Sequence, residues 1–446
     1  MYIRHGRFCF FRHSPEFARL CFILSLSWLV FTLPVFSQSL TSESAYQDTL
    51  RLKLTQADSM FLQNNLGLLA QQYQVDAARA AILQAKLWNN PNLSISQGMY
   101  NPTNKKWFDL SSSGETAVQI QQLILLAGKR NKQILIARDQ YQWNVYAFFD
   151  LMRTLRYTLH TDIFQLYYAQ QSINLYTYEI QSFQRLVRVL NEQYQKGFAA
   201  KKEVLRLQAQ LLDLQNQLVS IQQQIADLEA EVGVLLRVPR SYVIPELETD
   251  SLLSHLDMQQ YALASLIDTA LNNRADLHMA EFNLKMSQHN EQLQKALAVP
   301  DLTLAVGYDK NGSYVPNANL ISAGFDIPLF NRNQGNIQAA RSLVQYQQAQ
   351  FQQARDNIVS EVTNAYQQAL QAQRLYQSVD TSFYPSFQHL LEEVNLNYQH
   401  RNISMLELLD MYDAYKQAVL DYQNAQLNRL QTWEKLNYVI GRPIFH

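Results

Sequence analysis

The chain has 446 residues, and its 37 Lys and Arg nearly balance its 38 Asp and Glu, giving a formal net charge of −1. No basic patch stands out, so a nucleic-acid partner is not expected. The sequence contains no HExxH, GxSxG or phosphate-loop motif, so we expect neither an enzyme nor a cofactor. Both cysteines, Cys9 and Cys21, lie near the start, and the rest of the chain can form no disulfide or thiolate metal site.

The first segment has the features of a secretory signal. Four arginines precede an apolar run from Leu20 to Phe36, which is the order of a positive n-region and a short h-region. We predict that residues 1–37 are a signal peptide cleaved near Ser37. A membrane anchor is the alternative, although the run is short for a span of ~20 residues. Neither cysteine follows the run, so no lipid anchor is expected.

The chain contains an internal repeat. The segment YQKGFAAKKEVL at 194–205 matches YQHRNISMLELL at 398–409 with an offset of 204. Upstream, Asn90–Leu93 matches Val299–Leu302 with an offset of 209. A repeat at this scale sets the architecture of the whole chain. We predict a first repeat at 38–239, a linker at 240–262 and a second repeat at 263–446.

Each repeat is expected to contain a helix, two strands, a very long helix and a further helix. The first helix is predicted over Thr55–Trp88. Residues 129–196 contain neither Gly nor Pro, which predicts a helix about 100 Å long. Such a length is typical of a coiled coil or helical tube rather than a globular domain. In the second repeat, Pro385 is expected to interrupt the long helix, because proline is tolerated only in a first turn.

The helix predicted over Glu203–Leu236 shows a strict heptad of apolar residues. Its seam consists of Leu207, Leu211, Leu214, Leu218, Ile221, Ile225, Leu228, Val232 and Leu235. Such a seam predicts a left-handed supercoil against partner helices. Met411 to Ala425 continue the same register in the second repeat, and the seam degrades at Arg429.

Four segments alternate apolar and polar residues, about nine residues at a time. This length and alternation suit strands of a membrane barrel with apolar side chains toward lipid. A soluble sheet packed on a core is the alternative. The predicted lipid-facing residues are Leu93, Ile95, Val118, Ile120, Leu302, Leu304, Val306, Ile321 and Phe325.

Four strands are too few to close a barrel, and an open edge cannot persist in lipid. The chain is therefore expected to oligomerise. Two copies would give eight strands filled by their own side chains, whereas three would give twelve and leave an opening. A function as a pore would select three copies. The predicted fold is mainly α with a small β part: a long α-helical barrel continued by a membrane β-barrel with four strands per protomer and twelve in a trimer.

Three motifs then resemble a known family. QQLILLAGKRNKQ at 121–133 and IPLFNRNQGNIQAAR at 327–341 each lie where a strand gives way to a long helix. The stretch NRADL at 273–277, in the first helix of the second repeat, resembles the family's NRPDL with Ala275 in place of proline. Together with the repeat, these features resemble the TolC-type outer-membrane efflux proteins, and the first two stretches resemble their heavy-metal branch, CzcC and CusC.

The resemblance implies a homotrimer with its barrel in outer-membrane lipid and its helical tube in the periplasm of a Gram-negative bacterium. The tube would meet a periplasmic adaptor (membrane fusion) protein bound to an inner-membrane pump, and would conduct substrate passively. Heavy-metal cations are one candidate substrate. The alternatives are a duct for drugs or for type I protein secretion, and, from a different class, a periplasmic coiled-coil adaptor or scaffold.

The two helical hairpin tips are the expected functional sites. The predicted adaptor-contacting residues are Lys196, Gly197, Phe198, His400, Arg401 and Asn402. Just beyond the second tip, Glu407 and Asp410 are three residues apart and share a helix face. By the family resemblance they would face the pore as a periplasmic gate. A ring of carboxylates there could be held closed through Arg401 or Lys202. A solvated helix face is the alternative. The histidines are scattered, and no metal site is expected.

Overall fold

The computed structural model describes residues 48–254, 256–310, 316–379 and 383–444. All described elements belong to one compact unit, Tyr46–His446. The predicted signal peptide at 1–37 lies outside the described residues. Helices dominate this unit and strands form a small part of it, as the sequence predicted.

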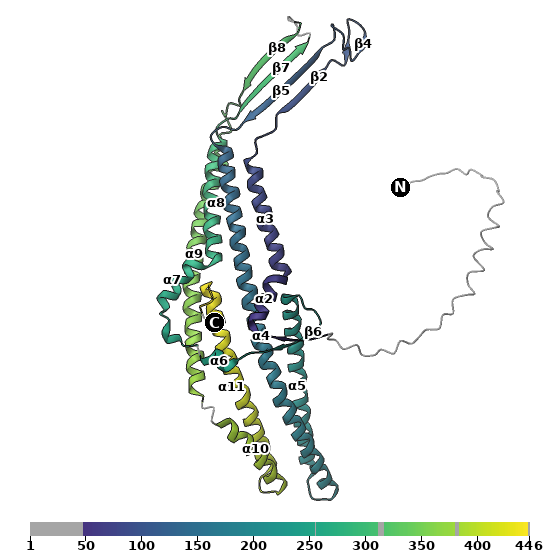
Figure 1. Ribbon diagram of the computed structural model, residues 1–446, viewed down its shortest axis with the longest axis vertical. Coiled ribbons are helices and arrows are strands. Elements are labelled where there is room, and N and C mark those ends of the chain that lie inside the picture. Colours follow the sequence, from purple (N-terminus) through teal and green to yellow (C-terminus); the bar gives the residue numbers. More distant parts are fainter. Residues whose placement is uncertain (1–47, 255, 311–315, 380–382, 445–446) are drawn as a thin grey trace, which may run out of the picture. The chain divides into compact units, whose positions relative to one another are not determined.

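The first half runs from a short strand to the end of a long helical hairpin. Its elements are β1 (Asp48–Leu52), α2 (Leu54–Asn64), α3 (Leu66–Lys86), β2 (Asn92–Gln97), β3 (Tyr100–Asn101), β4 (Lys106–Trp107), β5 (Thr116–Ile124), α4 (Lys129–Gln195) and α5 (Lys201–Leu236). In Figure 1 the strands β2 and β5 lie at one end of the helices, and the α4–α5 hairpin ends at the other.

The second half follows the same order after a connecting segment. Its elements are β6 (Ser241–Pro245), α6 (Thr249–Ser254), the short 3₁₀ turn η1 (Met258–Gln260), α7 (Leu263–Asn273), α8 (Ala275–Leu297), β7 (Leu302–Lys310), β8 (Ala318–Gly324), α9 (Gln334–Ser378), α10 (Phe383–Gln399) and α11 (Met405–Ile440). The offset of 209 carries α2 onto α7, and the offset of 204 carries α5 onto α11, residue for residue. The internal repeat is therefore structural.

The helix expected over Thr55–Trp88 is wrong as a single helix, because it breaks at Asn65. The side chain of Asn65 accepts a hydrogen bond from the amide of Leu68 at 3.0 Å and donates to the carbonyl of Leu235 at 3.0 Å. Asn65 therefore caps α3 and fastens it to α5. At the equivalent place in the second half, Arg274 separates α7 from α8 with nearly the same backbone angles. The NRADL stretch thus spans a helix junction rather than one helix.

The long helix was predicted to within one residue, as α4. It packs against α3 and α8 toward the strands and against α5 and α11 toward the tips. Two apolar clusters hold this packing, and both use the heptad seam of α5. Leu228 and Val232 pack with Phe61 and Ile163, while Leu207 packs near the tips with Phe183. The coiled-coil pairing predicted from the heptad is confirmed.

In the second half the long helix is interrupted, as expected. Helix α9 ends at Ser378 and α10 begins at Phe383, so that Pro385 occupies the first turn of the new helix. A proline there costs no intrahelical hydrogen bond, because the first amides of a helix have no partner. Within the ranges that the structure describes, no helix is both long and apolar enough to cross a membrane.

One feature of the fold was absent from the predictions. Strands β1 and β6 pair in parallel, with Asp48 opposite Ser241 and Leu52 opposite Pro245. Leu52 and Val243 are buried in the same cluster as Phe61. The start of the first half is thereby joined to the beginning of the segment that leads to the second half.

The four predicted strands form one antiparallel sheet in the order β2-β5-β7-β8. Two of them are shorter than the nine residues expected, six in β2 and seven in β8. Phe325, predicted within the last strand, follows it, since β8 ends at Gly324. A small additional hairpin, β3–β4, projects from the connection between β2 and β5.

Candidate functional site

The register of the sheet brings one apolar side chain from each strand into a single row. Leu93 is opposite Ile120, Ile120 is opposite Val306, and Val306 is opposite Ile321. All four side chains are exposed, from 49 % for Ile120 to 88 % for Ile321. Side chains directly opposite one another in a sheet lie on the same face. The row therefore crosses the whole width of one exposed face.

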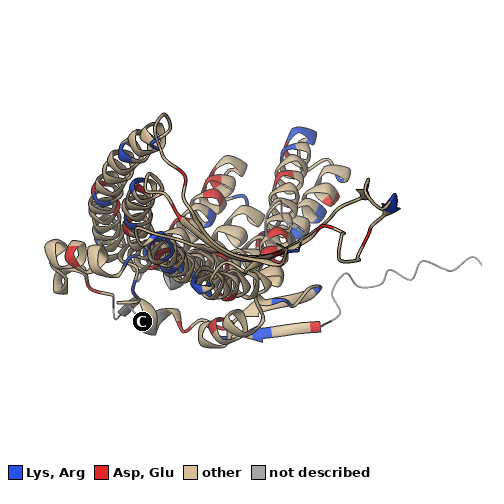
Figure 2. Cartoon of the chain, turned by 90° about the horizontal axis from the view of Figure 1, so that it is seen from above, with Lys and Arg blue, Asp and Glu red and all other residues tan. Residues whose placement is uncertain are grey.

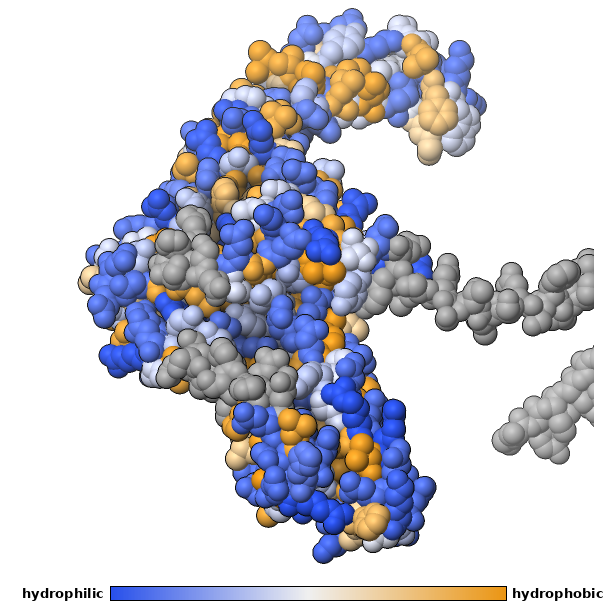
Figure 3. Space-filling view, turned by 60° about the horizontal axis from the view of Figure 1, so that its bottom comes forward, coloured by the Kyte–Doolittle hydropathy of each residue, from blue (hydrophilic) through white to orange (hydrophobic). Residues whose placement is uncertain are grey.

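The other predicted apolar residues of the strands fall on this same face. By strand register they are Ile95, Val118, Leu302 and Leu304. In Figure 3 hydrophobic side chains gather over the strands at the upper end. The opposite face is mostly polar, with Ser94 opposite Gln119 and Ala305 opposite Ser322. Along the described chain the outer edges of β2 and β8 have no strand partner.

The two helical tips have the same backbone. At the first tip, the amide of Phe198 donates to the carbonyl of Gln193 at 2.8 Å. At the second tip, the amide of Asn402 donates to the carbonyl of Asn397 at 2.8 Å. These are the six-to-one bonds of a Schellman cap, which needs a left-handed residue one position earlier. Gly197 and Arg401 occupy those positions, with φ of 77° and 62°.

Arg401 also joins one tip to the other. Its guanidinium donates to the backbone carbonyl of Phe198, 203 residues away. A cavity of about 310 Å³ lies between the tips, lined in part by Phe198, Glu203, Tyr398 and Arg401. Burial, followed by the nearby carboxylate of Glu203, raises the pKa of Tyr398 to about 12.

The two predicted gate carboxylates are exposed on the first turns of α11. Glu407 takes part in a capping box: its amide donates to the hydroxyl of Ser404 at 3.2 Å, and its carboxylate accepts from the amide of Ser404 at 3.4 Å. Within the described chain neither Glu407 nor Asp410 forms an ion pair with Arg401. The cation instead bonds to the other tip, which the sequence did not indicate.

Halfway along the helices lies a buried polar cluster that sequence reasoning missed. His160 of α4 is only 5 % exposed. Its Nε2 lies 2.9 Å from Asp58 of α2, and its Nδ1 lies 3.2 Å from Glu434 of α11. Arg156 approaches the same Asp58 carboxylate to 2.6 Å. A cavity of about 860 Å³ opens beside these residues.

The protonation of this cluster follows from its contacts. Burial lowers the pKa of His160, but the hydrogen bond to Asp58 and the nearby carboxylate of Glu434 outweigh it and raise the pKa to about 9. Burial likewise opposes ionisation of Asp58, and the contacts with His160 and Arg156 nevertheless lower its pKa. The cluster therefore holds a charged imidazolium at neutral pH.

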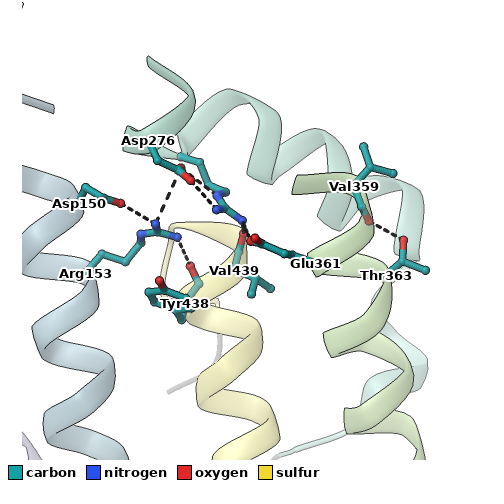
Figure 4. A network of polar contacts seen from close by, with 9 residues as sticks. Asp150, Arg153, Asp276, Val359, Glu361, Thr363, Tyr438 and Val439 are labelled. Carbon is teal, nitrogen blue, oxygen red and sulfur yellow. Dashed lines mark hydrogen bonds and ion pairs between the residues drawn. The ribbon is translucent and has the colours of Figure 1, made fainter. Parts of the chain in front are cut away.

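A second polar network lies at the junction of α7 and α8, and Figure 4 shows its members Arg153, Asp276 and Glu361. Arg153 donates to the carbonyl of Tyr438 at 2.7 Å and lies 2.5 Å from Asp150. Arg274 binds Asp276 through two nitrogens and reaches Glu361 at 2.5 Å. Four helices, α4, α8, α9 and α11, are thus joined at this point. Among the residues the structure describes, no group of three or more His, Cys, Asp or Glu could hold a metal ion.

The arrangement of helices and strands is that of outer-membrane channels. The CmeC channel of Campylobacter jejuni superposes with a TM-score of 0.71 at 15 % identity, covering 87 % of this chain and 85 % of that one. A structure of CusC superposes with a TM-score of 0.69 at 17 % identity, covering 92 % and 96 %. At these identities the likeness shows the fold.

The sequence itself then defines the family. The sequence model of the outer membrane efflux protein family matches residues 59–236 and 266–442 of this chain. The chain therefore belongs to the outer membrane efflux protein family, and the resemblance drawn from its motifs and repeat is confirmed.

Two curated relatives refine the comparison. The cation efflux system protein CusC of Escherichia coli O157:H7 is 29 % identical over 188 residues, which is 39 % of this chain and 40 % of that protein. The cobalt-zinc-cadmium resistance protein CzcC of Cupriavidus metallidurans is 20 % identical over 392 residues, covering 88 % of this chain and 90 % of CzcC. The match to CusC thus spans less than half of either protein.

Proposed function

We propose that three copies of this chain form an outer-membrane exit duct of a tripartite efflux system. The observation that carries the proposal is the four-strand apolar row Leu93–Ile120–Val306–Ile321, on a sheet whose two outer edges have no strand partner among the described residues. An open edge is not tolerated in lipid, where every backbone polar group needs a partner. Three sheets joined edge to edge close a twelve-stranded barrel and satisfy both edges.

In this trimer the exposed apolar face is turned to lipid. The lipid-facing residues on the strands are then Leu93, Ile95, Val118, Ile120, Leu302, Leu304, Val306 and Ile321, with Phe325 just beyond β8. The opposite face, which carries Gln119 and Ser322, lines a water-filled lumen. Alternation of this kind along each strand is the pattern of membrane barrels.

The helices continue the duct away from the membrane into the periplasm. The tips at Lys196–Phe198 and His400–Asn402 contact a periplasmic adaptor protein, which links the duct to an inner-membrane pump. The duct conducts passively, and the pump supplies the energy. Support comes from the exposure of both tips and from their shared backbone geometry, which offers a partner two similar docking points per chain.

At the second tip Glu407 and Asp410 form the periplasmic gate. Three chains bring six carboxylates around one axis, an arrangement that favours cations. Arg401 holds the closed state through its bond to the first tip and through pairing with carboxylates of a neighbouring chain.

The proposed cargo is heavy-metal cations. Support comes from the names of two relatives, a cation efflux protein and a cobalt-zinc-cadmium resistance protein. We also propose that residues 1–37 are a cleaved signal, and that the mature chain divides into repeats at 38–239 and 263–446 with a linker at 240–262.

The oligomeric state tests the duct directly. The protein purified from outer membranes should be a trimer in detergent by light scattering, and should conduct ions in planar bilayers. A stable, non-conducting monomer would rule out the proposal. Cells that lack the gene should accumulate Cu⁺, Zn²⁺ or Co²⁺, whereas accumulation of a fluorescent drug with unchanged metal content would identify a multidrug duct.

A further inference from the structure

The connection between β2 and β5 displays an unusual set of exposed apolar side chains. We call residues 98–115 the aromatic loop; it contains the small β3–β4 hairpin (Figure 1). Its exposed large apolar residues are Met99, Tyr100, Trp107, Phe108 and Leu110, at 62, 45, 66, 61 and 72 %. Within the chain these side chains gain little from burial, so their presence is not explained by folding.

The loop is built to hold one conformation. Asp109 is only 5 % exposed, and its carboxylate accepts hydrogen bonds from the Asn101 side chain at 2.8 Å, from Asn104 at 3.1 Å and from the Ser111 amide at 3.0 Å. This network closes the loop on itself from several sides. The exposed rings are therefore carried by a backbone that these hydrogen bonds hold in one conformation.

Two residues beside the exposed Trp107 are held in the left-handed region. Lys105 has a φ of 53° and Phe108 a φ of 49°. This conformation is unfavourable for a residue with a side chain, and a bulky residue is rarely found there. Such strain persists only when the surroundings impose it. Trp107 and the two lysines before it are exposed on this backbone.

The loop is fastened to one particular face of the sheet. Gln97, Thr116 and Lys310 form a cross-strand row of their own, on the same face as Leu93 and Ile321 by strand parity. From this row the Gln97 side chain donates to the carbonyl of Asp109 at 3.0 Å. Lys310 Nζ donates to the carbonyls of Leu110 and Ser111 at 3.0 and 2.8 Å. The loop therefore leans toward the apolar face.

The charged residues of the loop indicate which kind of surface it can bind. Lys105 and Lys106 are exposed beside Trp107, and Figure 2 shows Lys and Arg at the tip that projects from the sheet. Of the two acidic residues of this segment, Asp109 is buried and hydrogen-bonded, and Glu115 is exposed where the loop leads into β5. The exposed charges next to Trp107 in the sequence are therefore those of the two lysines. Aromatic rings next to lysines suit the boundary of a bilayer, where rings enter the headgroup level and ammonium groups meet phosphate.

We propose that the aromatic loop is a membrane-surface anchor that binds an anionic, phosphate-bearing lipid surface beside the barrel. Trp107, Phe108 and Leu110 enter the interface, and Lys105 and Lys106 bind lipid phosphate. The anchor fixes the depth of each protomer at the rim of the barrel. This inference rests on the proposed outer-membrane duct, since the lipid lies against the face that carries Ile321.

A spin label measures the depth of the loop directly. Because both cysteines lie within the first 21 residues, a cysteine introduced later can be the sole label site once Cys9 and Cys21 are removed with the signal or replaced. Leu110→Cys is the test position, because its exposed side chain is not one of the strained residues. Thr103→Cys is the control on the same loop, and Ile321→Cys reports on the barrel wall. Each trimer is labelled and reconstituted into vesicles of phosphatidylcholine with phosphatidylglycerol.

The expected result is a several-fold higher ratio of oxygen to water-soluble nickel accessibility at position 110 than at 103. In a Lys105→Gln, Lys106→Gln variant, or in vesicles of phosphatidylcholine alone, the ratio at 110 should fall toward that at 103.

A lipid-like signal at 321 with a water-like signal at 110 would overturn the anchor and leave the duct intact. Water-like signals at both positions would instead contradict the barrel assignment. Protection of position 110 in whole cells but not in vesicles would indicate a protein or polysaccharide partner and would also overturn the proposal.

Discussion

Nε2 of His160 lies 2.9 Å from a carboxylate oxygen of Asp58, although 102 residues separate them in the chain. The other imidazole nitrogen lies near Glu434. One buried cation thus joins α2 at the start of the chain, α4 in the middle and α11 at the end. Helices that form the wall of a tube have little core of their own, so such a link sets how they pack.

This link predicts a loss of stability at alkaline pH. The pKa of His160 is about 9 in the fold and ordinarily about 6.5 in an unfolded chain. The stabilisation is therefore fully present below pH 6.5 and is lost as pH rises through 9. Its size is on the order of 3 kcal/mol per chain. Thermal unfolding followed by circular dichroism at pH 6 and pH 10 measures it.

The matched variants are His160→Gln and His278→Gln, the latter at a more exposed ring of α8. The wild type should exceed His160→Gln in stability at pH 6 and lose most of that advantage at pH 10. His278→Gln should follow the wild type at both values. An equal difference at both pH values would mean that the charge of His160 contributes nothing.

The two faces of the sheet predict opposite responses to a charge. Val306→Arg puts a guanidinium into the apolar row, at about 2–4 kcal/mol per copy near the bilayer midplane. Ser322→Arg puts the same group on the polar face and should be tolerated. The measurement is the yield of folded trimer in outer-membrane fractions. Equal yields for the two variants would show that the face assignment is wrong.

The bond from the Arg401 side chain to the other tip predicts that this side chain, and not the left-handed backbone of Arg401, keeps the gate closed. Arg401→Ser removes the bond to Phe198, and should raise resting conductance in planar bilayers. Arg401→Gly removes the same bond and also relieves roughly 1 kcal/mol of left-handed strain, so it should conduct as Ser does while its hairpin is more stable. Wild-type conductance in the Ser variant would exclude this residue from the gate.

The carboxylates beside the tip predict ion selectivity. Glu407→Gln with Asp410→Asn removes six negative charges per trimer and should reduce cation preference and block by multivalent cations. Glutamine at 407 can still complete the capping box with Ser404, so α11 should remain folded. Asp421→Asn is the control, because Asp421 is an exposed carboxylate of α11 about three turns beyond Asp410. Selectivity that survives the double change would place the constriction elsewhere.

The helices could be predicted because their signals are local and long. The absence of Gly and Pro from 129 to 196, and the heptad from Leu207 to Leu235, each depend on one stretch of chain. The degraded seam at Arg429 also has a structural reason: this buried residue donates to the carbonyl of Leu256 and lies over the ring of Tyr376. It replaces an apolar contact with a link to the connecting segment.

What the sequence could not indicate depends on distant partners. Strands β1 and β6 are five residues each and nearly 200 residues apart. Neither is therefore long enough for its apolar and polar residues to predict a strand or its partner. The break at Asn65 depends on the carbonyl of Leu235, which only the folded hairpin supplies. His160 looked isolated because its two carboxylates come from other helices. The repeat could have located the break, since Arg274 stands 209 residues after Asn65.

The pairing of β1 with β6 has a consequence for biogenesis. The first strand of the described chain has no partner until residues 241–245 have been synthesised and exported. Contacts this distant in sequence form late, because a long loop must close first. During that interval the α4–α5 hairpin has already been synthesised, while β1 is still unpaired. Docking of β1 onto β6 therefore marks the moment when the first half of each protomer becomes a closed unit.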